Sequence, residues 1–277
     1  MILSEKQIEL INKKVRIFFH FNSSEKLKWI KMEKGFSNTK FIIKSRNDEP
    51  LSVCKIYNND PIISARKRLQ NEKRALELFG GKVAPELIWT DNSTILCYKY
   101  IKGKEIINLT NEERKNIEEE LVKTIEFVHN YNNLSLKENK EQYSQLSSFY
   151  STILDNYEKM NLSVPKHISK QFSLIRNSLK NLYLSMESER IKISYIHGDL
   201  VPLNIIVEKN QVSFIDFEYF RIDIPIFDYL YFNYFADKHQ LKIKLPVILK
   251  NKEIKNVYTN LIKLLNIYWS LSNEIEL

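Results

Sequence analysis

The chain has 277 residues, and its 42 Lys and Arg against 34 Asp and Glu give a formal net charge of +8. This length suits one large domain or two lobes, and hydrophobic residues at 43% are enough to form a core. The charge is scattered and no run of about 18 apolar residues occurs, so we expect neither a nucleic-acid partner nor a membrane span.

The first 100 residues are predicted to form a helix followed by a β-β-β-α-β-β arrangement. A helical pattern covers residues 4–20, and alternating residues at 26–33 and 38–45 indicate a hairpin around Gly35. The other predicted elements are a strand at 51–57, a helix from Pro61 to Phe79, and strands at 86–91 and 94–100.

After Gly103 the pattern becomes mainly helical, so we place the boundary between two lobes there. Thr110 begins a predicted helix that runs to Tyr131, and Glu113 stands three residues after it, the spacing of a capping box. A polar loop is expected at 132–142. The other predicted elements are helices at 146–160, 166–188, 226–236 and 252–272, and a β-hairpin of strands 205–208 and 212–217.

Glycine and cysteine are scarce, and this scarcity excludes several common sites. The five glycines form no P-loop, dinucleotide-binding fingerprint or nucleophile elbow. Gly80 and Gly81 are expected to end the preceding helix. Cys54 and Cys97 cannot form a disulfide framework and lack the spacing of a zinc site, so we expect a reducing, cytoplasmic environment.

The most informative segment is H-G-D-x-x-x-x-N, in which Asp199 is followed by Asn204. Asp216 comes twelve residues after Asn204, at the end of the predicted hairpin. Pro202 favours a turn that brings Asp199 and Asn204 together, and a carboxylate beyond a hairpin can return to the same point. Mg²⁺ prefers carboxylate and amide oxygens. Together, these carboxylate and amide oxygens are predicted to hold a metal–triphosphate. Asp199 would remain free to accept a hydroxyl proton.

This segment, followed by I-D-F-E around Asp216, resembles the aminoglycoside phosphotransferase and choline kinase superfamily. The resemblance covers most of the chain, from residue 26 to about 235. It implies an α+β, bilobal protein-kinase-like fold. Residues 1–103 would form a nucleotide-binding lobe with a five-stranded antiparallel sheet and a helix. Residues 104–277 would form a mostly helical lobe that carries the catalytic hairpin and binds the acceptor.

The resemblance also implies roles for individual residues. Asp199 aligns with the catalytic aspartate, and Asn204 and Asp216 align with the metal ligands. Lys55 aligns with the lysine that holds the α- and β-phosphates, and Glu72 with the glutamate that pairs with that lysine.

Three further features follow from the same resemblance. Gly35, Ser37 and Asn38 fall in the nucleotide-positioning loop. Lys99 and Ile101 fall in the hinge whose backbone pairs with the purine. Asp228 aligns with a buried aspartate that braces the catalytic loop.

His197 is expected to pack in its loop rather than to act as a base. Two other features each allow two interpretations. Glu218 either lies near the metal or caps the following loop. The aromatic residues at 214–235 either form core, as their spacing favours, or bind a quaternary ammonium by cation–π attraction.

Together these patterns predict a small-molecule kinase that uses ATP, or GTP, with Mg²⁺. The acceptor hydroxyl is expected on a choline- or ethanolamine-like or sugar-related molecule. An aminoglycoside is the alternative, although the C-terminal acids stand among many lysines. A nucleotide-binding pseudokinase or scaffold is the alternative of another class. A protein kinase is disfavoured, because about ten residues between Glu218 and Asp228 leave no room for an activation segment. The oligomeric state stays open between monomer and homodimer.

Overall fold

The computed structural model describes residues 3–33, 38–60, 63–131, 136–159, 166–189, 192–239, 241 and 251–272. The chain divides into two compact units: Met1–Thr124 with Leu203–Phe220, and Ile125–Pro202 with Arg221–Leu277. The boundary at residue 103 stays a prediction. Within the described segments, no helix combines the length and hydropathy needed to cross a membrane.

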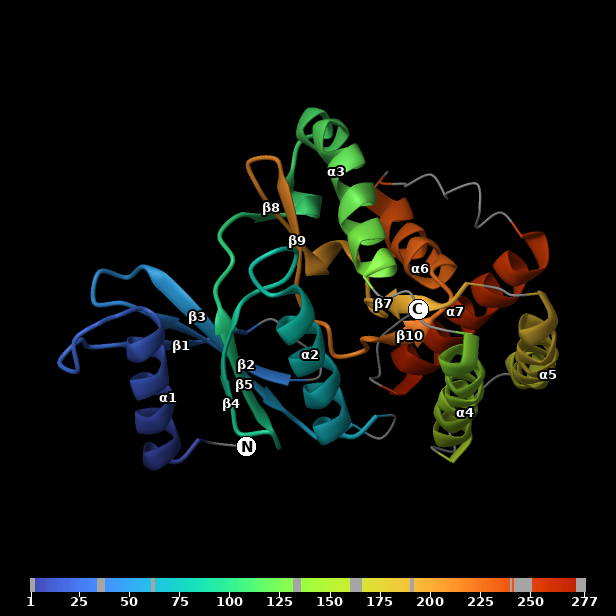
Figure 1. Cartoon of the computed structure of the whole chain (residues 1–277), viewed down its shortest axis with the longest axis horizontal. Helices are drawn as coiled ribbons and strands as arrows, with labels where there is room; N and C mark the ends of the chain where they lie inside the picture. Colours follow the sequence, from blue (N-terminus) through green and yellow to red (C-terminus); the bar gives the residue numbers. More distant parts are fainter. Residues whose placement is uncertain are drawn as a thin grey trace. The chain divides into compact units, whose positions relative to one another are not determined.

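A five-stranded antiparallel sheet forms the centre of the first unit, in the order β1-β2-β3-β5-β4 (Figure 1). Its strands are β1 (Lys28–Lys31), β2 (Asn38–Lys44), β3 (Pro50–Tyr57), β4 (Leu87–Thr90) and β5 (Ile95–Lys99). All five predicted strands are therefore confirmed. β1 and β2 pair antiparallel, as the predicted hairpin requires, although its turn at 34–37 lies outside the described residues.

Two helices pack on this sheet, α1 (Glu5–Phe18) and α2 (Ala65–Phe79). Val15 of α1 and Cys54 of β3 belong to one apolar cluster. Successive side chains of a strand point to opposite faces, so Lys55 points away from that cluster. On the opposite face of the sheet, the Lys55 side chain contacts Glu72 of α2. The alternation along β3 thus separates an apolar face under α1 from a charged contact under α2.

The start of α2 corrects one prediction. The helix begins at Ala65 rather than at Pro61, which lies outside the described residues. Ser64 is the N-cap, and its side chain accepts a hydrogen bond from the Lys67 N–H at 3.3 Å. A capping serine outweighs the proline as the start signal here. The end of α2 at Phe79, followed by Gly80, is as predicted.

A second, three-stranded sheet of the first unit carries the predicted hairpin. Its order is β6-β8-β9, from β6 (Lys104–Glu105), β8 (Ile205–Glu208) and β9 (Gln211–Phe214). β9 ends three residues earlier than predicted. Asp216 has a left-handed φ of 69°, which is incompatible with the extended backbone of a strand. Gly103 precedes β6 with a φ of 134°, and a Cβ there would lie 2.5 Å from the carbonyl oxygen of Val207. The close approach of β8 therefore requires glycine at position 103.

The second unit is mainly helical. Its helices are α4 (Leu136–Lys159), α5 (Lys166–Glu189), α6 (Ile226–Ala236) and α7 (Lys252–Ser272), and α3 (Asn111–Asn130) begins in the first unit and ends in the second. Tyr268 of α7 packs on the rings of Tyr157 in α4 and Phe172 in α5, with centroids 5.0 and 5.4 Å apart. A short antiparallel pair, β7 (Ser194–Ile196) with β10 (Arg221–Asp223), completes the unit.

Two details compare directly with the sequence predictions. The capping box is confirmed, because the Thr110 N–H donates to Glu113 Oε2 at 2.6 Å and the Glu113 N–H donates to Thr110 Oγ1 at 3.2 Å. The loop expected at 132–142 is wrong from residue 136 onward, because α4 begins there. Polar residues such as Lys, Glu and Gln mark that segment, and these are good helix formers as well as loop residues.

Candidate functional site

Lys55 and Glu72 form a buried ion pair in the first unit. The Lys55 side chain is fully buried, and its Nζ lies 2.7 Å from Glu72 Oε2. The Tyr57 hydroxyl donates a second hydrogen bond to the same carboxylate. Burial acts to lower the pKa of Lys55, but the surrounding carboxylates raise that pKa well above its ordinary value. The ammonium group is therefore held in its charged form inside the sheet-helix interface.

Asp216 joins this pair from the end of the hairpin. Its Oδ1 accepts a hydrogen bond from Lys55 Nζ, and its Oδ2 accepts one from Lys40 Nζ at 2.7 Å. Burial acts to raise the pKa of Asp216, but the ammonium groups of Lys40 and Lys55 bring it well below its usual range. Asp216 is therefore an ionised carboxylate with both oxygens in contact with a cation.

Glu218 belongs to the same cluster. Its Oε2 accepts hydrogen bonds from Asn38 Nδ2 at 2.8 Å and from the buried Arg68 Nη1 at 2.9 Å. The same oxygen lies 3.8 Å from Lys55 Nζ. Glu218 thus follows Asp216 by two residues in the chain, and both carboxylates lie close to the ammonium group of Lys55. The sequence analysis missed Lys40 and Arg68, because charged and polar residues are frequent in both segments and neither stood out from its neighbours.

Asn204 lies beside Asp216 in the backbone. It ends the short 3₁₀ turn η2 (Pro202–Asn204), is buried, and accepts a hydrogen bond from the Ile215 N–H at 3.0 Å through its carbonyl. The hairpin therefore brings the two predicted metal ligands to adjacent positions. An amide and an ionised carboxylate suit Mg²⁺, which commonly takes one or two protein ligands and completes its shell with phosphate and water. Among the described residues no group of three or more His, Cys, Asp or Glu could hold a metal.

The other predicted nucleotide residues are placed as follows. Asn38 is buried at the start of β2, where Glu218 contacts it. Lys99 ends β5, and its N–H donates to the Glu86 carbonyl at 2.9 Å. Ile101 follows two residues later. Gly35 and Ser37 lie outside the described residues.

In the second unit, Asp228 of α6 holds the loop that contains Asp199. Its carboxylate accepts hydrogen bonds from the N–H groups of His197 at 2.8 Å and Gly198 at 2.9 Å, and lies 3.0 Å from His129 Nε2. Burial acts to raise the pKa of Asp228, but the hydrogen bond and charge of His129 lower it overall. The predicted bracing of this loop by Asp228 is confirmed.

Two neighbours contact Asp199 directly. His197 is buried and its Nδ1 accepts a hydrogen bond from the Asp199 N–H at 3.2 Å, which is the loop-packing role predicted for it. The Tyr231 hydroxyl forms a hydrogen bond with the Asp199 side chain. Burial, together with Asp199, raises the pKa of Tyr231 well above its ordinary value, so the phenol is a hydrogen-bond donor. The sequence analysis counted Tyr231 only among the aromatic residues at 214–235 and gave it no contact with Asp199.

The aromatic residues at 214–235 are largely core, as the favoured alternative predicted. Those that are buried are Phe214, Phe217, Phe220, Phe227, Tyr229 and Phe232. The ring of Phe227 and that of Phe149 face the guanidinium of Arg221, with centroids 4.5 and 4.8 Å from its Cζ. Arg221 also pairs with the buried Asp223, Nη2 to Oδ2, at 2.8 Å. These rings therefore already hold a cation that belongs to the chain.

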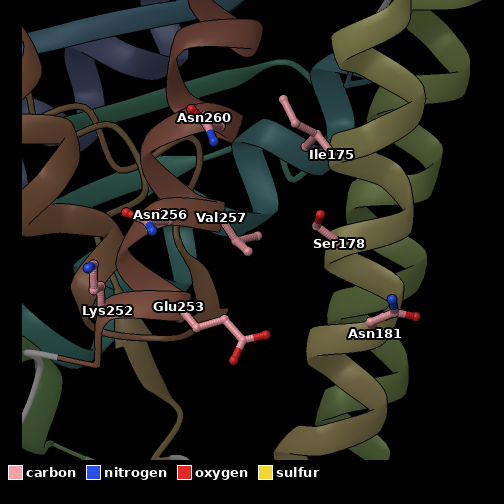
Figure 2. A pocket seen from close by; sticks show the side chains of 8 residues that line it. All are labelled: Ile175, Ser178, Asn181, Lys252, Glu253, Asn256, Val257 and Asn260. Atoms are coloured by element: carbon pink, nitrogen blue, oxygen red, sulfur yellow. The ribbon is translucent and has the colours of Figure 1, made fainter.

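A cavity of about 510 Å³ lies between α5 and α7 of the second unit (Figure 2). Its lining residues are Ile175, Ser178, Asn181, Lys252, Glu253, Asn256, Val257 and Asn260. Glu253 and Val257 point towards α5. One lysine and one glutamate balance in charge, so the lining is polar without being strongly acidic.

Comparison with known proteins identifies relatives of this arrangement. Residues 28–240 match the model of the phosphotransferase enzyme family. The search of curated proteins gave no match.

Several solved structures are similar to this chain in fold. The choline kinase of Cryptosporidium parvum is 14% identical, covers 97% of this chain and 89% of its own, and has a TM-score of 0.62. The ethanolamine kinase of Plasmodium vivax is 16% identical, with coverages of 97% and 82% and a TM-score of 0.60. The aminoglycoside phosphotransferase APH(2")-IIa, solved with streptomycin and ATP, is 15% identical, with coverages of 98% and 90% and a TM-score of 0.58. The predicted α+β, protein-kinase-like fold is thereby confirmed.

Proposed function

The chain belongs to the phosphotransferase enzyme family, and from this premise we propose that it transfers the γ-phosphoryl group of ATP to a hydroxyl group of a small molecule. The carrying observation is the buried Lys55, held between Glu72 and Asp216. A lysine that only solvates a surface strand would not be fully buried between two carboxylates, as Lys55 is. Phosphoryl transfer depends on positioning and on neutralisation of charge, and a cation fixed in this way supplies both.

The nucleotide partner is ATP, with GTP as the second possibility. Two of the related structures contain ATP or ADP, namely APH(2")-IIa and APH(4)-Ia. In this chain Lys55 is proposed to contact the α- and β-phosphates. Asn204 and Asp216 would hold Mg²⁺, which when bound neutralises charge on the phosphates.

Asp199 is the proposed catalytic base. The acceptor oxygen attacks the γ-phosphorus, the bond to the β,γ-bridging oxygen breaks, ADP leaves, and the hydroxyl proton passes to the Asp199 carboxylate. The hydrogen bonds from His197 and Gly198 to Asp228 fix the loop, and Tyr231 orients the carboxylate. This arrangement argues against a pseudokinase or scaffold, because a protein that only binds nucleotide does not require a positioned aspartate.

The acceptor is proposed to be choline- or ethanolamine-like, or related to a sugar. A polycationic aminoglycoside requires a strongly acidic pocket, whereas the acidic residues of the C-terminal segment stand among many lysines. Arg221 already occupies the rings of Phe149 and Phe227, which favours an uncharged sugar or alcohol over a quaternary ammonium at those rings.

The decisive experiment follows ATP consumption by the purified protein with Mg²⁺ across a panel of choline, ethanolamine, simple sugars and aminoglycosides. Turnover with one acceptor, lost in Asp199→Ala, would support the proposal and identify the branch. ATP binding without turnover of any acceptor would favour the pseudokinase. Efficient turnover of an aminoglycoside alone would overturn the acceptor class.

Lys55→Met is expected to lower kcat/KM by about 100-fold or more, the scale of removing one preorganised donor from a transition state. The change removes the buried cation that Glu72 and Asp216 share, and leaves Glu72 with the Tyr57 hydroxyl and Asp216 with Lys40. Lys73→Met is the matched control, because Lys73 is a half-exposed lysine of the same helix as Glu72 and pairs only with Glu77 among the ion pairs of the described residues. Steady-state kinetics and thermal unfolding of both variants would check the prediction. An unchanged kcat/KM in a folded Lys55→Met would remove Lys55 from the site.

A further inference from the structure

Lys40 is a second lysine in the charged cluster, with no role in the function proposed so far. It stands directly opposite Lys55 in the pairing of β2 with β3. Its Nζ lies 2.7 Å from Asp216 Oδ2. Its side chain is 17% exposed, whereas that of Lys55 is 0% exposed.

The two lysines compete with a metal ion for the same carboxylate. Lys40 and Lys55 each contact one oxygen of Asp216, so a divalent cation that binds this carboxylate would meet an ammonium group at either oxygen and compete with it. Lys55 is buried and also anchored by Glu72. Within the described part of the chain, Asp216 is the one ion-pair partner of Lys40. Lys40 is therefore the cation that gives way.

The charge balance indicates where Lys40 goes. The cluster holds three cations, Lys40, Lys55 and Arg68, and three carboxylates, Glu72, Asp216 and Glu218. A divalent cation on Asp216 adds two positive charges and repels the neighbouring ammonium group. A polyphosphate bound to that metal would bring a new anion to the cluster. The flexible four-carbon stem of lysine allows the ammonium group to follow it.

We propose that Lys40 is a second phosphate-binding lysine, which pairs with Asp216 in the metal-free protein and moves to the nucleotide polyphosphate when a divalent cation binds Asp216. This inference rests on the proposed function of the same site. It assigns two opposite effects to one side chain. Lys40 opposes the binding of metal alone and favours the binding of the metal–nucleotide complex.

The test compares Lys40→Met with the wild type in two binding measurements. Mn²⁺ titration of the nucleotide-free protein, followed by electron paramagnetic resonance, reports on Asp216 without its competitor. Calorimetry with ATP at saturating Mg²⁺ reports on the phosphate contact. We expect Lys40→Met to bind Mn²⁺ several-fold more tightly and Mg·ATP about tenfold more weakly, the scale of one charge-assisted hydrogen bond.

Two controls accompany the measurement. Lys31→Met removes an exposed lysine from β1 of the same sheet and is expected to change neither affinity. Lys40→Arg keeps the charge and is expected to retain most of the Mg·ATP affinity. It also keeps the inference testable where the methionine variant does not fold.

The outcomes separate the two proposals. Weaker binding of both Mn²⁺ and Mg·ATP, or no change in either, overturns the role of Lys40 and leaves the proposed function in place. Wild-type protein that binds no ATP overturns the proposed function, and the inference with it. Opposite changes in the two affinities, absent in Lys31→Met, support the inference.

Discussion

Asp199→Ala is expected to lower kcat for the accepted substrate by about 10³-fold, within the range that a positioned general base contributes. The variant loses the carboxylate that is proposed to take the acceptor proton. Its affinity for Mg·ATP is expected to stay the same, because the proposed nucleotide contacts come from Lys55 and Asp216. Single-turnover kinetics gives the first quantity, and calorimetry with ATP gives the second.

Asp199→Asn separates proton acceptance from shape. The amide retains the size of the side chain and an oxygen that accepts the hydrogen bond of Tyr231, but it cannot act as a base. We expect a loss of kcat close to that of the alanine variant. Retention of most of the turnover in both variants would contradict the assignment of Asp199 and leave the reaction without an identified base.

Asp223→Ala is expected to lower the free energy of unfolding by about 3–5 kcal/mol, the cost of removing one partner of a buried ion pair. The Asp223 side chain is fully buried and accepts hydrogen bonds from the hydroxyls of Tyr150 at 2.5 Å and Tyr258 at 2.7 Å. It also pairs with Arg221. Its removal leaves the guanidinium uncompensated among aromatic rings and two hydroxyls without their acceptor. Urea denaturation followed by circular dichroism measures the loss.

The matched control is Asp155→Ala, which breaks a solvent-accessible pair with Arg176 in the same unit, whose side chains are 45% and 34% exposed. Exposed pairs contribute about 0–1 kcal/mol, so this variant is expected to unfold close to the wild type. The double variant Asp223→Ala/Arg221→Met is expected to recover part of the stability, because it also removes the uncompensated charge. Equal losses for Asp223→Ala and Asp155→Ala would show that burial of the pair is irrelevant.

Local sequence predicted the elements and the family, because both depend on short-range patterns. Alternation identified the five strands, the capping box of Thr110 and Glu113 placed the start of α3, and the spacing of Asp199, Asn204 and Asp216 indicated the family. The short strands β6, β7 and β10 were missed, because two or three residues show no periodicity. Residues 136–142 were assigned to a loop because their polarity is common to loops and to exposed helix turns.

Only the tertiary structure decided which charges meet. Asn38 and Glu218 are 180 residues apart in the chain, yet their side chains share a hydrogen bond at 2.8 Å. Lys40 gave no sign in the sequence that it contacts the predicted metal ligand, because the pairing of β2 with β3 and the hairpin end bring them together. The sequence by itself thus determined the chemistry available to this protein. The contacts that hold each charge depend on burial and on long-range packing, which no local pattern encodes.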